Sequence, residues 1–156
     1  MTNLSEVTNY IVNRFQHDEM VNTIALSDND IIDTKKENIY PLVSISFNGA
    51  EIIEDIANNQ AFKNYDFTIS VLQQRDASRT MKPSKLMAET NWIDNMNECD
   101  SICTNFINYI RRLELDNLNI DSLSILEPLN RFGGADLDGF RFDITLSIPN
   151  TGFCGA

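Results

Sequence analysis

Apolar and polar residues alternate with a period of two along several segments of this 156-residue chain, as in a strand with one buried face. The clearest segment lies near the C-terminus. Its apolar positions are Phe140, Phe142, Ile144, Leu146 and Ile148, and polar side chains occupy the positions between them. We therefore expect an antiparallel sheet that buries one face and leaves the other face polar.

Further segments rich in β-branched and aromatic residues predict strands over residues 20–26, 40–47, 65–72 and 123–126. Pro41 has no backbone N–H, so the strand over 40–47 should lie at an edge or begin at this residue. Asn48-Gly49 predicts a turn, after which residues 50–56 can continue as a strand. Gly133-Gly134 and Asp138-Gly139 are also turn-forming pairs, and they predict a β-hairpin with a long tip over residues 127–139.

Two segments have the spacing of an amphipathic helix instead. Leu4, Val7, Ile11 and Phe15 predict a helix that ends near Gln16, with Thr2 or Asn3 as its N-cap. A longer helix is expected from Thr90 or Asn91 to about Leu113. One stripe of this helix carries Met96, Cys99, Cys103, Phe106, Ile110 and Leu113.

These elements define an α+β fold in a single domain over residues 1–156. We expect a mostly antiparallel sheet packed by an N-terminal helix and one long central helix. The apolar face of the sheet and the apolar stripes of the two helices would form one core.

The formal net charge is −11, which argues against a protein that wraps nucleic acid, because each phosphate contact requires a cation. No apolar run approaches the roughly 20 residues that a membrane-spanning helix needs, and the N-terminus lacks the pattern of a secretory leader. We therefore expect no membrane partner, no specific nucleic-acid binding and synthesis in a cytoplasm.

Residues 73–85 differ from the acidic remainder of the chain. They contain Arg75, Arg79, Lys82 and Lys85, but Asp76 is their only acid. A basic segment broken by proline in an acidic protein predicts an exposed, extended arm over residues 73–88.

The three cysteines do not predict catalysis or metal binding. Cys99 and Cys103 have the spacing of half a zinc site, but no second pair of ligands completes it. His17 and a cysteine would be needed for a thiol protease dyad, yet helical spacing places both mid-chain cysteines in the core. The chain offers no catalytic residue by this reasoning.

Two acidic groups have similarly ordinary explanations. Asp136 and Asp138 resemble half of a calcium loop, but a third oxygen ligand and the closing glutamate are missing. Asp28, Asp30 and Asp33 lie in a polar stretch, where solvation keeps them ordinary acids. We therefore expect no metal, no cofactor and no enzymatic activity.

Residues 17–47, HDEMVNTIALSDNDIIDTKKENIYPLVSISF, resemble small virion proteins of tailed bacteriophages. The most similar are those of crAss-like and related phages that infect Bacteroidetes. The strand that ends in LQQRD, the long helix, and a final strand followed by Pro149 and Phe153-Cys154 have a similar layout. The resemblance extends over nearly the whole chain.

This resemblance implies a tail-terminator-like subunit whose copies pack side by side into a twelvefold or sixfold ring. It implies a place in the virion neck or tail, with portal or other neck and tail proteins as partners and with DNA passing through the lumen. The candidate inter-subunit contacts are Arg75, Arg79, Lys82, Lys85, Arg131 and Arg141. The alternative is a monomeric acidic adaptor or inhibitor-type domain that binds a basic protein.

Overall fold

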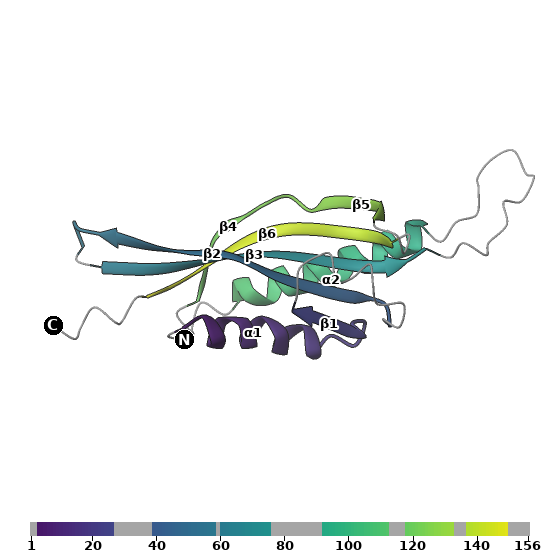
Figure 1. The fold of residues 1–156 in the computed structure, drawn as a ribbon, viewed down its shortest axis with the longest axis horizontal. Helices are drawn as coiled ribbons and strands as arrows, with labels where there is room; N and C mark the ends of the chain where they lie inside the picture. The colour runs from purple at the N-terminus through teal and green to yellow at the C-terminus, as the bar shows by residue number, and fades with distance from the viewer. Residues whose placement is uncertain are drawn as a thin grey trace, which may run out of the picture.

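The computed structural model describes residues 3–26, 39–58, 60–75, 92–112, 118–132 and 137–149. Its elements follow the order α1 (Leu4–Gln16), β1 (Thr23–Leu26), β2 (Leu42–Asp55), β3 (Gln60–Gln74), α2 (Trp92–Arg112), β4 (Asn119–Leu123), β5 (Glu127–Phe132) and β6 (Leu137–Pro149). The predicted α+β class is confirmed. Figure 1 shows both helices on the same face of the sheet.

The strands form one six-stranded sheet in the order β1-β2-β3-β6-β4, and β5 also pairs with β6. Only β1 and β2 run parallel, while the other pairings are antiparallel. The sheet is therefore mostly antiparallel, as expected. Because β2 and β3 are long, their hairpin reaches past the helices at the left of Figure 1.

Both helices begin and pack as their sequences predict. The side chain of Asn3 accepts a hydrogen bond from the backbone N–H of Glu6 at 2.9 Å, which caps α1. In the core, Phe15 of α1 stacks on Phe106 of α2 with ring centroids 4.4 Å apart. Both cysteines of α2 are buried beside them, as helical spacing predicted.

The alternation of β6 is confirmed on both faces. Phe142, Ile144, Leu146 and Ile148 are buried against the helices. On the other face, polar side chains hydrogen-bond across strands. Thr68 donates to Asp143 at 2.6 Å, and Thr145 donates to Asp66. The sheet therefore has one apolar face and one largely polar face.

The Asn48-Gly49 turn prediction is wrong. Both residues lie inside β2, where the register with β3 shifts between Phe47 and Gly49. Asn48 is the extra residue of this β-bulge, and Gly49 has a φ of 157°. The pairing with β3 continues on both sides of the bulge, so the strand over residues 50–56 is confirmed up to Asp55.

The C-terminal hairpin exists, but its predicted tip is too long. Glu127–Phe132 forms strand β5, and β6 begins at Leu137. Asp138 and Gly139 pair with Gln73 and Leu72 of β3, so they are strand residues rather than a turn. The strand predicted over 123–126 is also displaced, because β4 ends at Leu123.

Gly139 is required by packing. A Cβ at this position would lie 1.8 Å from the carbonyl oxygen of Val71. No side chain larger than hydrogen fits this approach of β6 to β3, so the glycine serves the strand pairing.

Candidate functional site

Among the described residues, Cys99, Cys103 and His17 are not arranged for nucleophilic catalysis. Burial, together with the neighbouring charges of Glu98 and Asp138, raises the pKa of the Cys99 thiol to about 12. Burial also raises the pKa of Cys103. Both thiols therefore stay protonated at neutral pH, whereas a nucleophile needs the thiolate. His17 is exposed at the end of α1, where its Nδ1 lies 2.6 Å from the carbonyl oxygen of Asn13.

The Asp138 carboxylate forms an ion pair within the chain, which its resemblance to part of a calcium loop did not predict. Its side chain is 0% exposed and accepts two hydrogen bonds from Arg75, at 2.9 and 2.7 Å. Asn95 of α2 donates to the backbone carbonyl of Gln74 at 3.1 Å and lies 3.4 Å from the Asp138 carboxylate. Within the described ranges, no three His, Cys, Asp or Glu residues gather into a metal site.

The same ion pair changes where the predicted arm can begin. Gln73 and Gln74 belong to β3, and the Arg75 side chain is only 12% exposed, so the arm predicted over 73–88 does not include these three residues. The Arg75 guanidinium neutralises a buried carboxylate of its own chain, and its predicted inter-subunit contact stays a prediction. Arg79, Lys82 and Lys85 lie outside the described residues, as do Asp28, Asp30, Asp33 and Asp136.

The two remaining arginines of the predicted contact set lie in the C-terminal hairpin. Arg141 of β6 forms an exposed ion pair with Glu127 of β5 at 3.0 Å. Arg131 belongs to β5. Of the six predicted contact residues, only Arg75 and Arg141 therefore have side chains that the structure describes.

The most unusual surface is the end of the β2–β3 hairpin. We call residues 46–58 and 60–63 the distal hairpin. It carries the exposed apolar side chains Phe47, Ile52, Ile53 and Ile56, and Ile56 is 87% exposed. Isolated exposed apolar residues are normal, but four on one extension form a patch that indicates an interaction surface.

The apolar residues occupy both faces of the distal hairpin. Ile52 and Ile53 are consecutive in β2 and so point to opposite faces, opposite Lys63 and Phe62 of β3. Both helices lie at one side of the molecule and neither reaches the tip of the hairpin (Figure 1). A hairpin that is apolar on both faces is suited to lie between neighbouring protein surfaces.

This part of β2 is also an edge strand. β1 pairs only with Leu42 to Ile45, so the remainder of β2 has β3 as its one strand partner among the described residues. Unpaired N–H and C=O groups on an edge are available to another chain. Glu51 and Glu54 are exposed on this edge and make the segment acidic.

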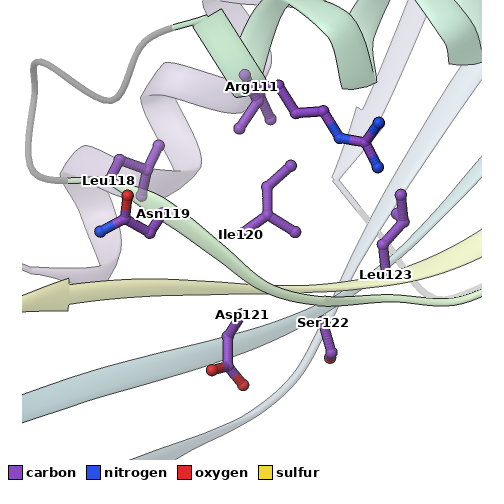
Figure 2. A pocket seen from close by; sticks show the side chains of 8 residues that line it. Arg111, Leu118, Asn119, Ile120, Asp121, Ser122 and Leu123 are labelled. Carbon is purple, nitrogen blue, oxygen red and sulfur yellow. The ribbon is translucent and has the colours of Figure 1, made fainter.

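A cavity of about 440 Å³ lies at the opposite edge of the sheet, between α2 and β4. Figure 2 shows the Arg111 side chain of α2 extending toward Leu123, with Ile120 and Leu123 on the same side of β4. Leu118 and Ile110 complete the apolar wall. Its other lining residues are polar or charged, namely Arg111, Asn119, Asp121 and Ser122, so the lining is mixed.

A second cavity of about 290 Å³ lies between the two helices. Tyr10, Asn13, Arg14, His17 and Tyr109 line it. The Arg14 guanidinium carbon lies 4.2 Å from the centre of the Tyr109 ring, so a cation–π contact already fills part of this site.

Our sequence reasoning missed the distal hairpin because Asn48-Gly49 was assigned to a turn. The signal was nonetheless present. Ile52-Ile53 interrupts the alternation of apolar and polar residues, and Ile56 follows at a turn, where polar residues are usual. Such a break in alternation indicates apolar side chains on both faces of a strand.

A comparison of the chain with protein-family models and with curated proteins finds no match. In the part of the chain that the structure describes, no helix combines the length and apolar character needed to cross a membrane.

Proposed function

We propose that this chain is a structural, non-enzymatic subunit of a tailed-bacteriophage virion and that its copies form a closed ring in the neck or tail. The distal hairpin carries this proposal. An extension that exposes Phe47, Ile52, Ile53 and Ile56 to water gains stability when a neighbouring subunit covers it. The resemblance of residues 17–47 to phage virion proteins supports the same role.

The layout of the sheet also supports a ring. A ring of identical subunits needs two different surfaces that are complementary to each other. This chain has an apolar, acidic edge at β2 and, at the opposite edge beside β4, a cavity of mixed lining that includes Arg111. The net charge of −11 suits a passage through which DNA moves without binding.

The ring would be sixfold or twelvefold, and its other partners would be portal, neck or tail proteins. Mass spectrometry of purified particles from a phage that encodes this chain tests the proposal, with electron microscopy of the neck and tail. We expect several copies per particle and density for a ring. Absence from the particle, or a single copy in it, would overturn the proposal.

The second candidate is a monomeric acidic adaptor, which the net charge favours because an acidic surface attracts a basic protein. Such a protein would be absent from purified particles and would give no ring in the neck or tail. Mass spectrometry and electron microscopy of the particles therefore separate the candidates.

A further inference from the structure

The distal hairpin has an edge that is open to another chain and carries negative charge. Glu51 and Glu54 are exposed, and neither forms an ion pair with a described residue. Asp55 is the third acid of the distal hairpin, and Lys63 is its one cation. The Lys63 ammonium lies 5.4 Å from the centre of the Tyr65 ring. A chain that suits this edge is therefore basic, and it carries apolar side chains to cover the exposed isoleucines.

The edge-to-edge pairing of two distal hairpins is unfavourable. In an antiparallel pairing centred on Ile52 and Ile53, Glu51 of one copy would lie opposite Glu54 of the other copy. Like charges directly opposite each other destabilise a pair of strands. Charged side chains on an edge strand are also a common means of preventing pairing between identical edges. The charge of this edge therefore opposes a symmetric contact and favours a different, basic segment.

Residues 77–88, which we call the basic segment, have the composition that this edge requires. They contain no acid, although the net charge of the whole chain is −11. Their cations are Arg79, Lys82 and Lys85. Their large apolar residues are Met81, Leu86 and Met87. Opposite charges across a contact fix its register and suppress wrong partners, so the acidic edge selects this segment over the acidic remainder of the chain.

The basic segment of one copy cannot reach the tip of the distal hairpin in the same copy. The fold holds the two ends of residues 76–91 together, because the Asn95 side chain of α2 donates to the Gln74 carbonyl at 3.1 Å. A segment of this length that is held at both ends extends at most roughly 30 Å. Ala61, the partner of Glu54, lies thirteen residues along β3 from Gln74, which is roughly 43 Å at about 3.3 Å per residue. The two surfaces therefore meet only between copies.

The distal hairpin and the start of the basic segment lie at opposite ends of the sheet. Figure 1 shows the tip of the distal hairpin at the left and the C-terminal end of β3 at the right. A contact between two different ends of identical subunits is heterologous, and it generates a ring when its rotation closes. In such a ring each copy donates one basic segment and receives one.

We propose that the basic segment of one copy docks on the acidic β2 edge of the distal hairpin of the next copy. The cations of the segment meet Glu51 and Glu54, and its methionines and leucine cover the exposed isoleucines. This inference rests on the proposed ring for the identity of the partner, and it adds which surface receives the basic segment.

Disulfide trapping tests the contact directly. Two full-length proteins that each carry Cys154→Ala are mixed, one with Thr80→Cys in the basic segment and the other with Ala57→Cys at the exposed tip of the distal hairpin. Cys99 and Cys103 can stay, because both are buried with raised pKa values. We expect a disulfide-linked heterodimer.

The matched control for trapping replaces Ala57→Cys by Asn105→Cys on the exposed side of α2, and it should give at least tenfold less linked product. A single chain that carries both Thr80→Cys and Ala57→Cys tests the reach of the basic segment. This chain should give linked dimers and larger species. A monomer closed by an internal disulfide would overturn the proposal, because the segment would then reach its own hairpin.

Charge reversal tests whether the ion pairs hold the contact. Arg79→Glu with Lys82→Glu in the donating copy, or Glu51→Lys with Glu54→Lys in the receiving copy, should lower the trapped yield at least tenfold. Combining both reversals should restore it. Glu19→Lys with Asp100→Lys changes the charge equally at other exposed positions and should leave the yield unchanged.

The outcomes distinguish the contact from the ring. Equal trapping at Ala57 and Asn105, or no trapping at either, overturns this contact, while a ring seen in particles leaves the proposed function standing. Specific trapping by a chain that is absent from particles keeps the contact and overturns the phage role. Trapping of the distal hairpin by a different virion protein instead of a second copy also overturns the contact.

Discussion

Arg75 and Asp138, which lie 63 positions apart in the chain, form an ion pair with two hydrogen bonds at the junction of β3 and β6. The carboxylate is completely buried, and Asn95 links the end of β3 to α2 beside it. The pair therefore fixes the end of β3 against β6 and α2.

Removing one partner of this pair should be strongly destabilising. Arg75→Met removes the two hydrogen bonds that Arg75 donates to the buried Asp138 carboxylate and should lower the free energy of unfolding by about 3 to 5 kcal/mol. The exposed pair of Arg141 and Glu127 provides the control, since Arg141→Met should cost no more than about 1 kcal/mol. Urea denaturation measures both. Equal effects at the two sites would show that burial does not govern the strength of the Arg75 pair.

Gly139 should tolerate no side chain. Gly139→Ala would place a Cβ against the carbonyl oxygen of Val71, so the pairing of β3 and β6 must shift, at a cost of about 3 kcal/mol or more. Gly49→Ala is the control, because nothing lies within 4 Å of its Cβ position and only its φ opposes the change. We expect a smaller cost there, about 1 kcal/mol. Thermal and urea unfolding compare the two variants, and a larger loss at Gly49 would contradict the packing argument.

The buried face of α2 should not tolerate a charged side chain, but it should tolerate the replacement of cysteine by valine. Phe106→Asp and Cys103→Asp each bury an unpaired carboxylate and should abolish the cooperative unfolding transition. Asn105→Asp adds the same charge on the exposed side of the helix and should leave the transition in place. Cys99→Val with Cys103→Val should fold. Loss of assembly in that folded double variant would point to metal or redox chemistry at the thiols.

The buried thiols should make stability depend on pH in the alkaline range. The pKa of Cys99 rises from 9.0 to about 12 on folding, so the unfolded chain releases this proton at a lower pH than the folded chain. The stability is therefore complete below pH 9 and is lost as the pH rises toward 12. The expected loss is about 1.4 kcal/mol per pH unit for each thiol that stays protonated.

Urea unfolding at pH 8 to 10.5 measures this effect by comparing the native chain with the Cys99→Val, Cys103→Val variant. Lysines and tyrosines titrate in both proteins, so only the difference between them reports the thiols. Parallel curves would show that the thiols ionise equally in the folded and unfolded chains.

The basic segment beyond Arg75 should contribute to assembly and not to the folded subunit. Deleting residues 78–84 removes Arg79 and Lys82 and should leave the melting temperature unchanged, while ring or inter-ring assembly weakens, because these cations would meet acidic neighbouring copies. Replacing Arg79, Lys82 and Lys85 by serine keeps the length and should weaken assembly in the same way. Normal particles from both variants would show that the segment has no role in assembly.

Local sequence determined the elements that depend only on side-chain period. The spacing of Val7, Ile11 and Phe15 predicted α1, and the alternation around Phe142 predicted both faces of β6. These predictions held because the backbone geometry of a helix or a strand decides which residues share a face. The α+β class followed from the same pattern.

The tertiary structure decided the features that depend on residues distant in the chain. Asn48-Gly49 has the composition of a turn. However, β2 pairs with β3 both before and after these two residues, so they form a bulge inside the strand. Gly139 has the composition of a turn as well, yet its role comes from the approach of Val71. In the sequence Arg75 belongs to a basic segment, but in the fold it lies beside Asp138 and forms an ion pair with it. In each case the local preference was weak, and strand pairing or burial of a charge across the fold was the stronger effect.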